Sequence, residues 1–323
     1  MDIYPSRIGI RSGAHGRTSL ARLRELIKLS LRSALQPHAT HGWLGLLNSD
    51  PVFGQLVSAR PRLVGKVFRP YLSTTFNSAQ RTSLLIGHYH SILRLGWAPL
   101  VLQAATMGVE LGALPGKSAG VLRLVVRAVE PMEREGELAL QLMHNEELVC
   151  SCAVVLIGGL DGFDIGVGCI QGPSSDAGLS IIREATRQLH GLRPKSLLIK
   201  LLCALGHRYG CDGLRLVGNG NRTVRGAIRQ GKVHADYDAF WRECGATPRD
   251  DGDYYMRCAA LATPDLLSMA SSKRSGARHR HEVLRKLVGI VSARLDREGR
   301  QGTTPYQVVP DGAHTGSVLV DQP

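Results

Sequence analysis

The sequence of 323 residues has few aromatic side chains and no long apolar run. Phenylalanine, tryptophan and tyrosine make up 5% of the residues, too few to predict a stacking surface for single-stranded nucleic acid. The longest apolar stretch, residues 83–114, is interrupted by Arg94, Pro99 and Glu110, so no transmembrane segment is predicted. Residues 1–19 lack the apolar core of a signal peptide. We therefore expect a cytoplasmic protein.

Several motifs of catalysis and metal binding are also missing. The seven cysteines form no CxxC pair and have no zinc-site spacing to histidine, which predicts reduced, structural thiols. The Gly-x-Ser-x-Gly elbow of a serine nucleophile is absent, and the glycine-rich run 218–222 lacks the Gly-Lys-Ser/Thr ending of a P-loop. His88 and His90 have no evident third ligand and would diverge on a helix. The sequence therefore predicts no metal cofactor.

Positive charge, by contrast, is abundant. Forty Lys and Arg residues against 27 Asp and Glu residues give a formal net charge of +13. Such a surplus predicts an anionic ligand, which would be a phosphate-bearing cofactor or an acidic lipid surface. Nucleic acid is disfavoured, because no helix-turn-helix, zinc finger or aromatic stacking signature accompanies the charge. A basic surface without a dedicated partner is the plain alternative.

The first part of the chain predicts helices. Residues 1–17 are expected to form a flexible leader, and residues 18–116 a helical N-terminal region. Between residues 18 and 35 the apolar and basic residues follow separate helical stripes: Leu20, Leu23, Ile27, Leu31 and Leu35 on one face, Arg24, Lys28 and Arg32 on another. We favour a helix that docks on the core through its apolar stripe, and a membrane-surface helix is the alternative.

The pattern changes near residue 117. Segments 121–129, 137–144, 147–157 and 163–171 predict an antiparallel meander, followed by helices over 176–190 and 194–209. A strand over 213–218, a helix over 237–244 and a strand over 253–258 come next. This order predicts an α/β (α+β) domain over 117–262, with a mixed sheet and flanking helices. Residues 263–298 are expected to form a basic helical segment, and residues 299–323 a disordered tail.

The loop before the helix at 194 has the composition of a pyrophosphate site. Backbone N–H groups at a helix start attract anions, and Gly191 allows a phosphate to approach the backbone closely. Gln188, Arg193 and Lys195 add polar and positive groups. A capped turn with two solvated bases is the alternative interpretation.

Two runs, 214–221 and 237–247, resemble the C-terminal half of the GNAT acyltransferase fold. Phe240, Trp241 and Gly245 stand where that superfamily has a Phe-Tyr pair and a Gly-Phe turn, and Gln188-x-x-Gly191-x-Arg193 is similar to its pyrophosphate loop. The resemblance implies acyl-CoA as the cofactor, with a site made of these groups: Gln188, Gly191, Arg193, Lys195, Asn219, Asn221, Phe240 and Trp241.

The same resemblance has three departures. Arg193 replaces the Gly or Ala of the superfamily loop, a predicted helix precedes that loop, and Ala246 replaces the usual aromatic residue. These departures favour a shared fold over a bound acyl-CoA.

Acyl transfer to an amine needs a proton acceptor and a donor for the developing oxyanion. The candidate bases are Glu184, His190, His234 and Asp236, and Tyr237 is the candidate for protonating a thiolate. Each has a structural alternative: Glu184, for example, as a solvated helix residue. We select Glu184, His190 and Tyr237 as the catalytic candidates.

A broader resemblance extends from about residue 50 to 298. Several unusual runs occur in the order found in the VirK/YbjX family of Gram-negative bacteria: 168–173, 184–186, 190–195, 235–241 and 272–275. The resemblance implies a role in virulence, linked to the cell envelope and to resistance against cationic antimicrobial peptides, and it implies no particular reaction.

Two functional hypotheses lead. One is a GNAT-like acyltransferase that uses acyl-CoA or another acyl donor. The other is a non-enzymatic regulator, or a peripheral module on the inner membrane, that binds anionic partners through its basic helices.

Overall fold

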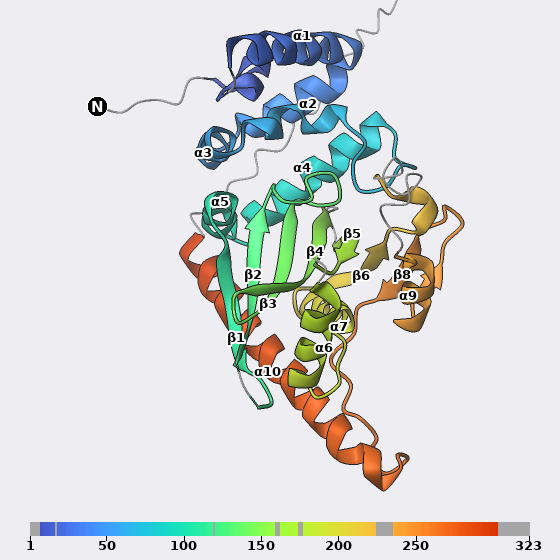
Figure 1. Ribbon diagram of the computed structural model, residues 1–323. Helices are drawn as coiled ribbons and strands as arrows, with labels where there is room; N and C mark the ends of the chain where they lie inside the picture. The colour runs from blue at the N-terminus through green and yellow to red at the C-terminus, as the bar shows by residue number, and fades with distance from the viewer. Residues whose placement is uncertain are drawn as a thin grey trace, which may run out of the picture.

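The computed structural model describes residues 7–16, 18–118, 120–158, 162–173, 177–223 and 235–302. The chain begins with helices, continues into a β-meander and ends on a long helix (Figure 1). The helices of the first part are η1 (Ile10–Ala14), α1 (Ser19–Leu35), α2 (Pro37–Leu47), α3 (Pro51–Ala59), η2 (Pro61–Phe68), α4 (Ser78–Arg94) and α5 (Ala98–Thr106).

Local signals explain where these helices begin. Pro37, Pro51 and Pro61 each occupy the first turn of a helix, where the missing N–H costs nothing. The Asp50 carboxylate accepts a hydrogen bond from the Val52 N–H at 2.8 Å and so caps α3. Asn77 and Gln80 form a reciprocal capping box at α4.

One mixed sheet follows. Its eight strands are β1 (Val109–Pro115), β2 (Val121–Ala128), β3 (Leu138–His144), β4 (Glu147–Gly158), β5 (Phe163–Gln171), β6 (Cys211–Leu216), β7 (Thr247–Pro248) and β8 (Tyr254–Arg257). They lie in the order β1-β2-β3-β4-β5-β6-β8-β7, and β5–β6 is the parallel pair among these strands. A parallel pair needs a crossover, which α6 (Gly178–Gln188) and α7 (Pro194–Arg208) supply. The predicted α/β class is thus confirmed.

β1 departs from the prediction that residues 18–116 form a helical region. It is an edge strand, paired with β2 on one side, and its register shifts between Glu110 and Gly112. Gly108 precedes the strand and Gly112 interrupts its apolar alternation, so the sequence carries no clear period-two pattern there. Because the local pattern is weak, the pairing with β2 determines that this segment is a strand.

The other helices that the described residues form in the second part are η3 (Asn219–Asn221), α9 (Tyr237–Glu243) and α10 (Ser271–Gly302). In Figure 1, α10 runs diagonally past the sheet, and its first turns extend beyond α6 and α7. α5, α7 and α10 pack over one face of the sheet, where Trp97 Nε1 donates a hydrogen bond to the Leu295 carbonyl at 3.2 Å.

A single hydrophobic core extends from Ile8 to Leu295. Within the segment expected to be a leader, η1 forms a short turn with Gly13 and Ala14 buried against its neighbours. α10 continues to Gly302, three residues past the predicted start of the tail, and residues 1–6 and 303–323 lie outside the described ranges. The proposed division of the chain into five parts stays a prediction.

The orientation of α1 overturns one expectation. Its apolar stripe points to solvent, with Leu20, Ile27 and Leu31 more than half exposed, so the prediction that this stripe docks on the core is wrong. The opposite face docks instead, because Leu29 fills a hole that Gly13 and Gly65 leave open. A Cβ on Gly65 would lie 2.7 Å from Leu29 Cδ2, which is too close for a stable contact.

Candidate functional site

The predicted phosphate loop connects α6 to α7. Gln188 is buried at its start, where Oε1 accepts a hydrogen bond from the Ser118 N–H at 2.9 Å. Its Nε2 donates to Glu184 Oε1 at 2.7 Å, and Glu184 also pairs with Arg187. These contacts hold the turn between β1 and β2 against α6. Gln188 and Glu184 therefore have local structural partners.

His190 and Gly191 form the turn itself. Both have positive φ, 55° and 84°, and Gly191 N–H donates to the Thr186 carbonyl at 2.8 Å, which ends α6. The His190 ring stacks on His279 of α10 with centroids 4.7 Å apart. Desolvation, and then the nearby positive groups, lower the pKa of His190. Its imidazole is therefore neutral near pH 7.

Arg193 and Lys195 point in different directions. Arg193 is exposed and pairs with Glu243 of α9, with Nη1 and Oε1 2.6 Å apart. Lys195 lies instead near Cys150, Cys169 and Arg222, and desolvation lowers its pKa. The two bases that were predicted to share one phosphate site thus serve different environments.

Beside Arg193 a groove of about 600 Å³ opens. Its walls are α7, the end of α9, the segment 259–269 and the first half of α10. Most of its lining is apolar: Leu192, Ile199, Ala204, Met256, Leu261, Met269, Ala277 and Leu284. A groove of this size and character suits an amphipathic ligand.

The polar lining of the groove is mainly cationic. Arg193, Lys200 and Arg280 contribute positive side chains, and Glu243, which pairs with Arg193, is the single acidic residue among the described residues that line it. Among the described residues no side chain caps α7, so the first turn of this helix, beside Ser196, keeps the partial positive charge of a helix start. The electrostatics therefore favour an anion at the end of the groove next to Arg193.

Sequence reasoning missed the other wall of this groove. Lys200 lies inside the predicted helix 194–209 and was not named as a candidate, and Arg280 and His281 belong to the basic segment 263–298, which was expected to be separate. Arg280 Nη1 donates to the His190 carbonyl at 3.4 Å, which brings this run to the predicted loop. The basic run indicated an anion-binding surface, but the sequence did not show that this run packs beside the loop at His190.

Tyr237 occupies a buried site next to β5. Its hydroxyl donates to the Ile170 carbonyl at 2.8 Å and accepts from the Ile170 N–H at 3.0 Å, at the edge that β6 leaves unpaired. Cys169 Sγ lies 3.2 Å away, and the Arg222 guanidinium covers the ring at 4.0 Å. Burial raises the pKa of Tyr237 and of Cys169. Both stay protonated near pH 7, so Cys169 is not an activated nucleophile.

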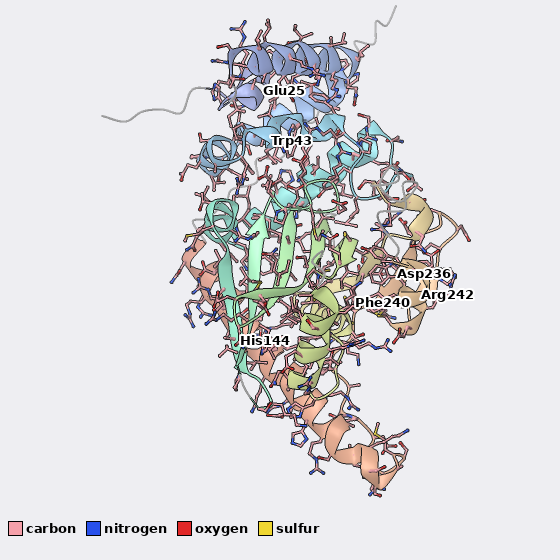
Figure 2. The ribbon with its side chains drawn as sticks, viewed as in Figure 1. Glu25, Trp43, His144, Asp236, Phe240 and Arg242 are labelled. Carbon is pink, nitrogen blue, oxygen red and sulfur yellow. The ribbon has the colours of Figure 1, made fainter. Side chains whose placement is uncertain are left out.

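The other candidates stabilise the neighbourhood of α9 (Figure 2). Asn219 Oδ1 accepts from the Tyr237 N–H, and Asn221 Nδ2 donates to Asp253 Oδ1. Buried Trp241 donates from Nε1 to the Val217 carbonyl at 2.9 Å, and Phe240 packs against its ring. Asp236 caps α9 by accepting from the Ala239 N–H, and this bond lowers its pKa. His234 lies outside the described residues.

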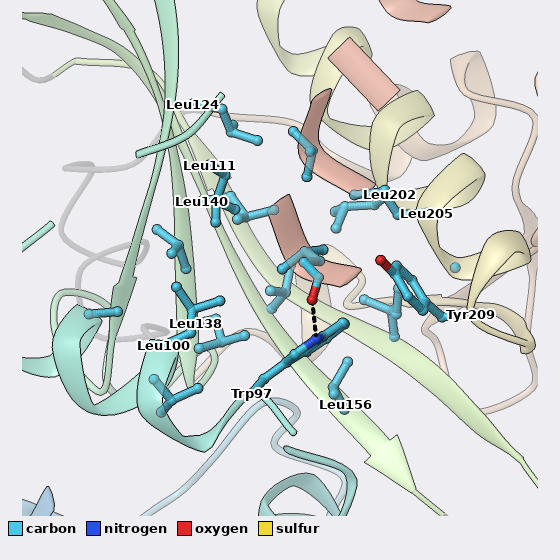
Figure 3. A pocket seen from close by; sticks show the side chains of 18 of the residues that line it. Trp97, Leu100, Leu111, Leu124, Leu138, Leu140, Leu156, Leu202, Leu205 and Tyr209 are labelled. Atoms are coloured by element: carbon cyan, nitrogen blue, oxygen red, sulfur yellow. Dashed lines mark hydrogen bonds between the residues drawn. The ribbon is translucent and has the colours of Figure 1, made fainter. Parts of the chain in front are cut away.

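A second hollow lies between the sheet and α5, α7 and α10 (Figure 3). It measures about 80 Å³, and its walls are almost wholly apolar side chains such as Leu111, Leu138 and Leu202. Such a cavity stays dry and offers nothing to a charged ligand. It is part of the core, and the groove remains the candidate site.

Two classes of site are not found in the part of the chain that the structure describes. No group of three His, Cys, Asp or Glu side chains there is arranged to hold a metal ion. His88 is buried, and its Nδ1 accepts a hydrogen bond from the Leu156 N–H at 3.1 Å. Within the same ranges, no helix is both long and apolar enough to span a bilayer.

Comparison with known proteins places the chain among bacterial relatives. It is 28% identical over 263 residues to "Uncharacterized protein YbjX" of Escherichia coli K12, covering 80% of this chain and 79% of that protein. It is 27% identical over 303 residues to an "Uncharacterized protein" of Haemophilus influenzae, covering 91% and 94%. "Membrane protein LapB" of Mannheimia haemolytica is 28% identical over 205 residues, covering 62% and 84%.

No solved structure matches this chain. The resemblance to the GNAT fold thus stays a hypothesis, whereas the relationship to YbjX is confirmed. A family model matches residues 18–292, which is most of the chain, and the protein belongs to the family described as "Protein of unknown function (DUF535)".

Proposed function

We propose that the protein binds a phosphate-bearing ligand with an apolar chain, of the acyl-CoA class, in the groove beside α7. The observation that carries this proposal is the combination of an apolar groove with cations at an uncapped helix start. The phosphates would lie near Arg193, Lys200 and Arg280, and the acyl chain would lie along the apolar lining. Charge-assisted hydrogen bonds to phosphate are among the strong polar contacts that proteins make.

Acyl transfer is the catalytic form of this proposal. The acceptor amine must lose a proton, and His190 is the candidate base, because its lowered pKa keeps the ring neutral. His281 lines the groove and is a second candidate. Glu184 and Tyr237 are less suited, since their polar atoms are engaged by Gln188 and Ile170. Release of CoA in the presence of amine acceptors, compared between the wild type and His190→Gln, tests this step.

Calorimetric titration tests the binding itself. Acetyl-CoA and a long-chain acyl-CoA should both bind, the latter more tightly, because each buried methylene adds about 0.8 kcal/mol. Lys200→Glu combined with Arg280→Glu should weaken binding at least about tenfold, since each lost charged contact is worth about 1.5–3 kcal/mol. Arg183→Glu on the exposed surface of α6, away from the groove lining, is the matched control and should bind as the wild type does.

Two results would contradict the proposal. One is the absence of heat with either ligand from a folded sample. The other is equal affinity in the groove variant and in the wild type, which would move the ligand elsewhere.

The second candidate function is a non-enzymatic regulator or a peripheral module on the inner membrane. The basic helices favour it: α10 exposes Lys273 and Arg278 on its protruding first turns, and α1 exposes Arg24 and Lys28. A relative carries the name "Membrane protein LapB". Co-sedimentation with anionic but not neutral vesicles, weakened by salt, is the expected result. Lack of binding at low salt would exclude this function.

The setting is proposed from the family resemblance. A role in the cell envelope and in resistance to cationic antimicrobial peptides predicts that deletion of the gene lowers survival in such a peptide. Complementation with the wild type, but not with the Lys200→Glu/Arg280→Glu variant, would connect that phenotype to the groove. Full complementation by the variant would show that survival in the peptide does not depend on the groove.

A further inference from the structure

α1 exposes a continuous apolar stripe. The exposed fractions are 84% for Leu20, 56% for Leu23, 59% for Ile27, 61% for Leu31 and 72% for Leu35. These five make up half of the large apolar side chains that the described residues leave exposed, although α1 has only 17 residues. Their spacing of three or four residues places them on one side of the helix. A contiguous apolar surface of this kind marks an interaction site.

The stripe is held outwards by contacts on the opposite side of α1. Leu29 is buried between Gly13 and Gly65, and the Glu25 carboxylate lies 3.8 Å from the Arg69 guanidinium. Figure 1 shows α1 as the outermost helix at one end of the molecule, with α2 beneath it. Rotating the stripe inwards would expose Leu29 and separate Glu25 from Arg69. The outward orientation is therefore a property of the fold.

The charges around the stripe indicate what covers it. Arg24 and Lys28 are exposed and lie beside the stripe on the helix surface. Glu25 is the single acidic residue of α1, and it faces the body of the protein (Figure 2). The outer surface of α1 thus combines leucines with uncompensated positive charge, which is the pattern of helices that lie in the interface of an anionic bilayer.

We propose that α1 lies flat on an anionic membrane leaflet and inserts its leucine stripe among the acyl chains. This inference rests on the second candidate function and deepens it, since it names the surface and the mode of contact. Electrostatic attraction alone is screened by salt, whereas insertion of leucines is not. Binding through α1 therefore keeps a component that survives high salt.

The test is co-sedimentation with vesicles of phosphatidylglycerol and phosphatidylethanolamine at low and high salt. Leu23→Gln/Ile27→Gln/Leu31→Gln should lower the partition coefficient at least about tenfold, because burial of each leucine is lost. The control is Met107→Gln/Leu179→Gln, which changes two exposed apolar side chains outside α1 and α10, 57% and 69% exposed, and should bind as the wild type does. Arg24→Glu/Lys28→Glu should lose the salt-sensitive part of the binding.

The outcomes separate this inference from the function on which it rests. If the wild type binds and the leucine variant binds equally well, the peripheral function stands and insertion by α1 is wrong. If the wild type dimerises, the leucine variant is monomeric and vesicles bind neither, the stripe belongs to a second copy and the membrane inference is overturned. Far-ultraviolet circular dichroism and thermal unfolding establish that the variants keep the fold.

Discussion

Two neighbouring residues show how differently the two sides of the sheet are built. Leu138 lines the apolar cavity beneath α5, α7 and α10. Glu137, the residue before it, pairs with Lys66 of η2, with Nζ and Oε1 2.6 Å apart, and accepts a hydrogen bond from the Tyr89 hydroxyl at 2.7 Å. Lys66 is 5% exposed and Glu137 is 2% exposed. One side is stabilised by apolar burial, and the other contains a buried ion pair.

The difference predicts unequal sensitivity to substitution. The apolar side contains unfilled space, so a small increase in side-chain volume there has little cost. On the polar side Lys66 and Glu137 neutralise each other, and the loss of either leaves the opposite charge buried and uncompensated. The buried charges also act on their neighbours: burial, and then Glu137, raise the pKa of Tyr89.

The largest effect is expected from breaking the ion pair. Lys66→Met leaves the Glu137 carboxylate without its cation and should lower the free energy of unfolding by about 3–5 kcal/mol. Adding Glu137→Gln should restore most of the loss, because Gln removes the charge and still offers Tyr89 an acceptor. Urea denaturation of the two variants measures both changes. If Lys66→Met is as stable as the wild type, the ion pair does not make the polar side more sensitive to substitution than the apolar side.

The next effect is a dependence on pH. Burial lowers the pKa of His88, on α4 beside this pair, from 6.5 to about 4. The folded state then keeps His88 neutral while the unfolded state takes up a proton below about pH 6.5, so stability is lost as the pH falls from 6.5 towards 4. The full loss is about 3 kcal/mol, since one pKa unit corresponds to about 1.4 kcal/mol.

His88→Asn tests this assignment. The Asn side chain can still accept the Leu156 N–H but does not titrate. Urea midpoints at about pH 7 and about pH 5 should differ less in the variant than in the wild type. An unchanged difference would assign the acid sensitivity to other groups.

The sequence predicted much of the sheet and of the two helices that connect β5 to β6. The strands β2 to β5 alternate or run continuously in Val, Leu and Ile, and the bounds of α6 and α7 are right within two residues, because Gly191, Pro194 and Gly210 punctuate them. Local patterns carry this information, since helices and strands are encoded in windows of a few residues. β1, whose pattern is interrupted by Gly112, is where this reasoning failed.

Contacts between distant segments could not be predicted in the same way. Lys66 and Glu137 lie about 70 residues apart, and the loop at His190 meets Arg280 across 90 residues. No periodicity records such a meeting, so the sequence drew attention to the loop at 188–195 but not to the first half of α10, which lies beside it. The orientation of α1 could not be predicted either, because an apolar stripe does not show which face of a helix packs on the core. Contacts of Leu29 with Gly13 and Gly65 determine that the opposite face packs.

The smallest effect is expected from filling the apolar cavity. Val126 lines it from β2 and is 3% exposed. Val126→Ile adds one methylene to a hollow of about 80 Å³, so it should raise the free energy of unfolding by at most about 1 kcal/mol without strain. Val155→Ile on the same sheet, at a buried residue outside the cavity, is the matched control and should destabilise by overpacking. If both substitutions destabilise equally, the cavity does not make the apolar side more tolerant of an added methylene. The two sides of the sheet would then differ in their buried charge and not in their packing.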